Sequence, residues 1–198
     1  PAGNLPAEQQ SRLERGREEY LQAQQAMAER PEAQVNMGNL YAARGEAGLA
    51  NDAYRAAIEL NPAFAPAYVN HADLLRNQGD EEKAEAVLRQ AVAVIPENGD
   101  VYHALGLSLV RQNRTAEAIE QLGKAARLAP DNARYVYVYA VALNSTGNTE
   151  RAIMVLQGAH NRFPNNTDIL NALVAFHRDS GNSEAARAYA EKLQGLSR

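Results

Sequence analysis

Residues 31–64 read PEAQVNMGNLYAARGEAGLANDAYRAAIELNPAF, and the features of this stretch return along the chain at a fixed interval. After Pro62, further prolines follow at steps of 34 residues, at Pro96, Pro130 and Pro164. Small residues keep the same step in three columns, which are Gly38, Ala72, Gly106 and Ala140; Ala50, Ala84, Ala118, Ala152 and Ala186; and Ala57, Ala91, Ala125 and Ala159. A fixed period of this length indicates an array of one repeated supersecondary unit.

The proline column and the small-residue columns resemble those of the tetratricopeptide repeat, a helix-turn-helix unit of 34 residues. This resemblance implies an all-α fold, a right-handed superhelical solenoid of antiparallel helix pairs with about 11 helices. The repeats are then residues 31–64, 65–98, 99–132, 133–166 and an incomplete 167–198. Residues 1–30 are expected to form a loose tail and a helix over 7–28 that caps the N-terminal end of the array.

Each repeat is predicted to join its two helices through a short turn that contains Gly. The third repeat has Asn113 at this place, and Asn also tolerates a left-handed backbone. Thr115, Thr149 and Ser183 are predicted as N-caps of second helices because their hydroxyl groups can accept from free backbone amides.

One segment carries two conflicting patterns. Residues 134–143, RYVYVYAVAL, alternate with a period of two, which by itself predicts a strand. The repeat register instead predicts a helix with four inward side chains, and a lone strand would find no partner in a helical array. We therefore expect a helix whose inward side chains are Val136, Tyr139, Ala140 and Leu143.

Composition excludes several classes of function. With 45% hydrophobic residues the chain can bury a core, and without cysteine it has no disulfides or cysteine-based metal sites. The net charge of −4 argues against nucleic-acid binding. No apolar run is long enough for a membrane-spanning helix, and the first residues do not resemble a signal peptide, so we expect a soluble segment without direct membrane insertion.

The sequence also gives little support for catalysis. Its four histidines, His71, His103, His160 and His177, lie in different predicted helices without the short spacing of a metal site. No phosphate-binding glycine loop or nucleophile motif is present, since the glycines fall at the repeat turns. We therefore expect a protein that is not an enzyme and that has no metal or cofactor.

The resemblance implies that the first helix of every repeat lines a concave groove, where a ligand is expected. Repeat positions 2, 5, 9 and 12 share one helix face, with positions 6 and 13 at its edge. From these positions the candidate ligand-binding residues are Asn36, Asn39, Asn70, Asp73, Arg76, Asn77, His103, Leu107, Arg111, Tyr137, Val141, Asn144 and Arg178.

Two kinds of contact are expected in this groove. Asn36, Asn39 and Asn70 each carry a donor and an acceptor, which suit the backbone of an extended peptide, although such amides also bond neighbouring helices. Tyr137 with nearby aliphatic residues has the composition of a binding hot spot, unless its ring packs on the next repeat. Binding of chaperone C-terminal carboxylates is not expected, because the family's basic clamp positions hold Val35, Asp100 and Ala104.

The sequence thus predicts a non-catalytic scaffold that binds another protein or a peptide in its groove. Two alternatives stay open: self-association into a homo-oligomer through the convex face or the exposed array end, near Ala186, Ala190 and Leu193, and an accessory role in a larger enzyme or membrane-anchored protein. The family resemblance alone suggests a bacterial source, and the cytoplasm and the periplasm fit equally. A start at Pro rather than Met fits a mature form or a piece of a longer protein.

Overall fold

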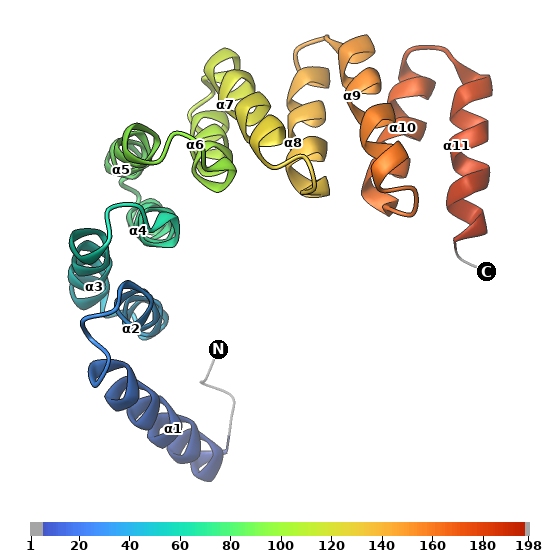
Figure 1. The fold of residues 1–198 in the computed structure, drawn as a ribbon. Coiled ribbons are helices and arrows are strands. Elements are labelled where there is room, and N and C mark those ends of the chain that lie inside the picture. The colour runs from blue at the N-terminus through green and yellow to red at the C-terminus, as the bar shows by residue number, and fades with distance from the viewer. Residues whose placement is uncertain (1–5, 197–198) are drawn as a thin grey trace. The chain divides into compact units, whose positions relative to one another are not determined.

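The computed structural model describes residues 6–196, and every regular element in that range is an α-helix. The chain forms two compact units, which adjoin in the sequence between Pro96 and Glu97. In each unit, successive helices are joined by short turns into hairpins (Figure 1). The prediction of an all-α fold of paired helices is confirmed.

The first unit begins with a helix that precedes the repeats and continues with two hairpins. α2 packs on α3, α4 packs on α5, and the two hairpins meet through α3 and α4 and through α2 and α4. The bounds are α1 (Ala7–Gln25), α2 (Pro31–Ala43), α3 (Ala47–Leu60), α4 (Ala65–Asn77) and α5 (Glu81–Val94).

The second unit consists of three hairpins. The first helices of its last two repeats, α8 and α10, touch each other, and α8 also packs on both α7 and α9. The bounds are α6 (Gly99–Arg111), α7 (Thr115–Leu128), α8 (Ala133–Asn144), α9 (Thr149–Arg162), α10 (Thr167–Asp179) and α11 (Ser183–Gly195).

The hairpin turns share one backbone geometry. Each contains one residue with positive φ, which is Gly in four turns and Asn113, with φ of 59°, in the other. A backbone hydrogen bond closes each turn. In the third repeat the amide of Arg114 donates to the carbonyl of Leu109 at 2.9 Å, and the other hairpin turns make the same bond. This is the hydrogen bond of a Schellman motif, and the predicted role of Asn113 is confirmed.

The predicted N-caps were wrong by one residue. Thr115, Thr149 and Ser183 are the first residues of their helices, and the cap is the residue before each. In the last hairpin that residue is Asn182, whose side-chain oxygen accepts from the amide of Ala185 at 3.1 Å. The sequence places two adjacent capping residues there, and the turn closure decides which of them lies at the cap position.

Close packing within each hairpin depends on the small residues. A Cβ atom added to Gly38 would lie 2.5 Å from the ring of Tyr54, and one added to Gly106 would lie 2.6 Å from the side chain of Leu122. Both pairs join the first helix of a repeat to its second helix. The column therefore consists of small residues because a large side chain of the neighbouring helix fills the space beside each position.

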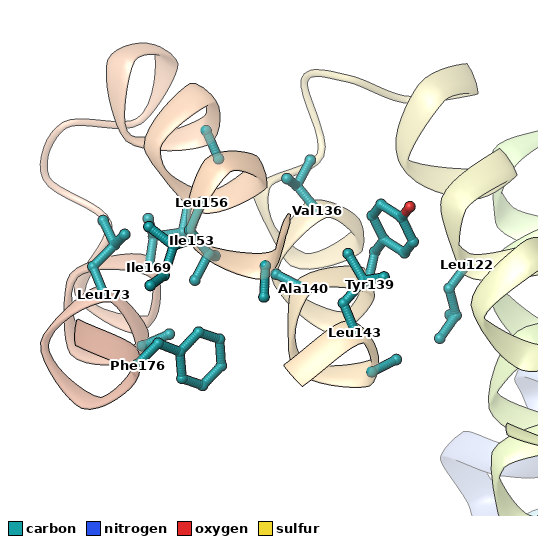
Figure 2. Close-up of a cluster of buried hydrophobic side chains, with 14 residues drawn as sticks. Leu122, Val136, Tyr139, Ala140, Leu143, Ile153, Leu156, Ile169, Leu173 and Phe176 are labelled. Carbon is teal, nitrogen blue, oxygen red and sulfur yellow. The ribbon is translucent and has the colours of Figure 1, made fainter. Parts of the chain in front are cut away.

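The second unit buries a continuous apolar core (Figure 2). Leu143, Leu156 and Leu173 are all at most 1% exposed and come from α8, α9 and α10. The strand-like stretch 134–143 lies within α8, so the helix prediction is confirmed. Its four predicted inward side chains, Val136, Tyr139, Ala140 and Leu143, are all buried.

The helix before the repeats is mostly exposed. α1 contacts α2, yet the only buried residue of α1 is Gln24. Two apolar side chains of α1 are exposed, Leu13 at 36% and Tyr20 at 44%. An added Cβ at Gly16 meets no atom within 4 Å, so no neighbouring helix lies close to α1 there.

Truncation of Leu122 to Ala should lower the free energy of unfolding by about 2 to 5 kcal/mol, because the side chain is fully buried against Gly106. The same truncation at Leu49, which is 51% exposed, should cost about 0.5 kcal/mol or less. Urea unfolding of both variants measures the difference, and equal losses would contradict this account of the core.

Candidate functional site

In the first unit, two of the predicted groove asparagines are in contact. The side-chain oxygen of Asn39 on α2 accepts from Nδ2 of Asn70 on α4 at 3.0 Å. The same oxygen accepts from the hydroxyl of Tyr54 at 2.8 Å. Burial, with a smaller effect of the Asp73 carboxylate, raises the pKa of Tyr54 to about 12, so this hydroxyl remains a donor at neutral pH.

The asparagine pair leaves one donor and one acceptor open. Nδ2 of Asn39 and the side-chain oxygen of Asn70 make no hydrogen bond within residues 6–196. Asn39 is exposed and Asn70 is half-buried, so a ligand can reach both groups. A donor beside an acceptor is the complement of one peptide unit of an extended chain.

The other predicted residues of this unit either have a partner within the protein or lie at the end of a helix. Nδ2 of Asn36 donates to the side-chain oxygen of Gln24 on α1 at 3.1 Å, which ties α1 to α2. Arg76 and Asp73 form an exposed ion pair at 3.3 Å along α4. Asn77, at the end of α4, is exposed.

In the second unit, the predicted aromatic residue lines a hollow. Tyr137 on α8 lies at an opening of about 390 Å³ between α8 and the start of α10. Arg134 stands on the α8 side and Asp168 on the α10 side, so the two flanks carry opposite charges. The hollow can receive an apolar side chain with charged neighbours on either side.

Tyr137 is the one residue lining this hollow that the sequence analysis gave as a candidate, and Val138 and Asn166 are among those it missed. Val138 occupies the sixth repeat position, as Asn36 and Asn70 do in their repeats, and a uniform use of that position would have found it. Asn166 precedes α10, and its side-chain oxygen caps that helix by accepting from the amide of Ile169 at 3.0 Å. A search restricted to helix positions could not include this residue.

His103, another predicted site residue, lies on α6 and is buried. The residue is 7% exposed, and its ring stacks on the ring of Tyr135 at a centroid distance of 4.1 Å. The hydroxyl of Tyr135 donates to Asp100 at 2.6 Å, and this bond holds the Tyr135 ring over His103. A ligand on this face would meet Tyr135 before His103.

The remaining predicted residues of the second unit differ in exposure. Asn144 accepts through its side-chain oxygen from the hydroxyl of Thr149 at 2.8 Å and so links α8 to α9. Val141 is 40% exposed, and Leu107 is half-buried. Arg111 and Arg178 are exposed near the ends of their helices, and Arg178 lies 3.6 Å from Asp179.

Comparison with known families identifies the repeats. Three family models, each described as tetratricopeptide repeat, match residues 31–64, 64–131 and 103–167. The chain belongs to the tetratricopeptide repeat family. No curated protein sequence matches this tetratricopeptide repeat chain.

Solved structures resemble this tetratricopeptide repeat protein in fold. MamA from Desulfovibrio magneticus has a TM-score of 0.67 at 18% identity, covering 85% of this chain and 95% of its own. YrrB, described as having an unusual peptide-binding site, has a TM-score of 0.65 at 21% identity, covering 89% and 91%. PilF of Pseudomonas aeruginosa has a TM-score of 0.69 at 21% identity, covering 91% and 78%.

The described residues hold neither a metal-binding cluster nor a membrane-spanning helix. Between residues 6 and 196, no cluster of three or more His, Asp or Glu side chains is arranged to hold a metal ion. Over the same range, no helix combines the length and the apolar character that crossing a membrane requires.

The buried His103 should make stability depend on pH. Burial, with a smaller effect of Arg134 and against the opposing effect of Asp100, lowers the pKa of His103 to about 4. Between this value and the unfolded-state histidine pKa of about 6.5, the unfolded state binds a proton that the folded state does not. The free energy of unfolding should therefore fall as pH decreases from about 6.5 towards 4.

His103→Phe retains a ring against Tyr135 but cannot titrate, so its free energy of unfolding should depend less on pH in this range. Urea unfolding between about pH 7.5 and 4.5 measures both proteins. The other three histidines are common to both, and identical pH slopes would exclude the contribution of His103.

Proposed function

We propose that this protein is a non-catalytic scaffold that binds segments of other proteins through the first helices of its repeats. The observation that carries the proposal is the pair Asn39 and Asn70, which presents an open donor beside an open acceptor on adjacent helices. Such a pair can hold the backbone of an extended peptide without reading its side chains.

The second unit supports the same class of ligand. The hollow beside Tyr137 can anchor one apolar side chain of a peptide, and its oppositely charged flanks can orient the residues next to it. YrrB, a chain of similar fold, is described as having a peptide-binding site, which is consistent with peptide recognition here.

Binding fits the described residues better than catalysis does. The histidines at 71, 103 and 160 are buried, and burial lowers the pKa of each. A buried neutral histidine beside a tyrosine ring is typical of helix packing, and none of these three lines the hollow beside Tyr137.

Asn70→Ala and Tyr137→Ala should each weaken peptide binding by about tenfold, because each removes an anchoring contact. Ligands are first selected from a displayed library of random peptides, and their affinities are measured by calorimetry. Asn70→Ala is preferred to Asn39→Ala, since it leaves the bond from Tyr54 to Asn39 intact.

Control substitutions lie on the second helices. Glu82→Gln on α5 and Gln157→Ala on α9 change exposed residues away from the proposed surface and should bind as the unchanged protein does. If every selected peptide binds the two groove variants with unchanged affinity, the proposed surface is wrong. If the library yields no ligand, extended-peptide recognition is contradicted.

A second candidate function is self-association through an end of the array. Leu13 and Tyr20 lie two turns apart on one face of α1, and both are exposed. At the other end, Leu196 is 42% exposed beyond α11. Exposed apolar residues on a terminal helix favour contact with another copy of the chain.

Sedimentation velocity over a range of concentrations tests this candidate. The chain should form dimers or larger species, and Leu13→Glu with Tyr20→Glu should shift it towards the monomer because the charges oppose burial of α1. A monomer at all concentrations would exclude self-association through α1.

A further inference from the structure

A second hollow of the second unit lies between the second helices of two repeats, apart from the proposed peptide surface. It opens between α7 and α9, has a volume of about 360 Å³, and has α8 as its floor. Its lining includes Val136 and Tyr139 of α8, which Figure 2 shows, and neither Tyr137 nor Val141. A function here goes beyond the peptide binding proposed above.

Three arginines surround this hollow and no carboxylate lines it. Arg127 comes from α7, and Arg151 and Arg162 come from α9. All three are exposed, and none forms an ion pair within residues 6–196. Nη2 of Arg151 donates to the hydroxyl of Tyr139 at 3.1 Å, which holds this guanidinium group at the rim.

The rest of the lining is apolar and open. Met154, at 63% exposed, has the highest exposure among the large hydrophobic residues of the described chain, and Val155 lies beside it in the lining. A Cβ atom added to Gly158 meets nothing within 4 Å, so the wall is recessed at this point. The hollow thus combines three unpaired cations with an apolar surface that a ligand side chain can cover.

The first unit contains the equivalent hollow two repeats earlier, and its charges differ. It lies between α3 and α5, with His71 of α4 at the place of Tyr139, and has a volume of about 320 Å³. Glu59 stands where the second unit has Arg127, and Gln90 stands where it has Gly158. The lining of the first hollow also includes Arg55, so in the first unit the same backbone arrangement carries one arginine with one glutamate, and a longer side chain at the place of Gly158.

At two further positions the first unit also has fewer unpaired positive charges than the second. Lys83, the counterpart of Arg151, is paired with Asp80. Val94, the counterpart of Arg162, carries no charge. The repeat fold alone consequently does not require three unpaired arginines at this place, since the first unit forms the same hollow without them.

We propose that the hollow between α7 and α9 binds an acidic segment of a partner protein that also carries an aliphatic side chain. Carboxylates of the segment pair with Arg127, Arg151 and Arg162, and the aliphatic side chain packs on Met154. Guanidinium groups form short, charge-assisted hydrogen bonds to carboxylates, and Met adapts to varied apolar surfaces.

An acidic protein segment fits this hollow better than a nucleic acid. Recognition of single-stranded nucleic acid relies on exposed aromatic rings for base stacking, and the one ring of the lining, Tyr139, is 9% exposed. The chain also has a net charge of −4, which opposes the approach of a long polyanion. A free phosphate ion has no apolar group to cover the exposed Met154 side chain.

Nuclear magnetic resonance titration of the ¹⁵N-labelled protein tests the proposal. The probe is the acetylated and amidated peptide Asp-Glu-Leu-Asp-Glu, compared with Asn-Gln-Leu-Asn-Gln and with Asp-Glu-Gly-Asp-Glu. The acidic leucine peptide should shift the amide signals of residues 123–127 and 151–162, with an affinity that falls as salt increases. The other two peptides should bind at least about fivefold more weakly.

Matched variants locate the contact. Arg127→Gln with Arg162→Gln should weaken binding by about tenfold or more. Gly158→Gln, which introduces the residue of the first unit, should also weaken binding by filling the recess, and Gln favours a helix more than Gly does. Arg55→Gln in the equivalent hollow of the first unit is the control and should leave the affinity unchanged.

Several outcomes would overturn the proposal. These are shifts confined to the first helices of the repeats, equal binding of the amide peptide, unchanged affinity in the double arginine variant, or tighter binding of inorganic pyrophosphate or a short RNA to the same residues. The groove variants Asn70→Ala and Tyr137→Ala should not affect this peptide, so failure here is distinct from failure of the proposed function.

Discussion

The close approach of the two helices in each hairpin is the constraint on which the other features depend. At Gly38 and Gly106 the absence of a Cβ atom allows a large side chain of the second helix to lie directly against the backbone of the first. Apolar burial over many such contacts drives the fold, and each contact requires a residue without a large side chain at one fixed position. Because the contact recurs every 34 residues, the first and second helices keep constant roles, and the surfaces that they present recur as well.

Tyrosine hydroxyl groups connect this packing to the surface. Tyr54 enters the space above Gly38, and its hydroxyl reaches Asn39, which in turn orients Asn70. In the second unit the ring of Tyr139 lies 3.1 Å from the Cβ position of Gly123, and its hydroxyl accepts from Arg151. In both units a buried ring thereby fixes the position of an exposed polar side chain. A ligand that meets a side chain already held in place loses less conformational entropy on binding.

The sequence predicted the fold well because the period constrains backbone geometry directly. The register identified 134–143 as helical against its own strand-like alternation, since tertiary packing overrides local propensity. It placed the cap of the last hairpin at Ser183 instead of Asn182, because both residues suit that role and only the turn closure separates them. The register of the repeats does not extend to α1, whose apolar side chains are largely exposed because the described structure provides no second neighbour along most of the helix.

The candidate sites were less predictable, because they depend on which side chains meet across repeats. The repeat register shows that Asn39 and Asn70 each lie on a suitable helix face, whereas their shared hydrogen bond depends on the spacing between α2 and α4. The arginines around the α7–α9 hollow occupy helix positions that also suit solvated charge, and none of them by itself indicates a site. Comparison between repeats separates positions that the scaffold requires from positions that it leaves free. Residues that the scaffold requires recur at both hollows, whereas one equivalent position holds Glu59 in the first unit and Arg127 in the second. In a repeat array, the positions free of the packing constraint are therefore those where a binding site can arise without loss of the fold.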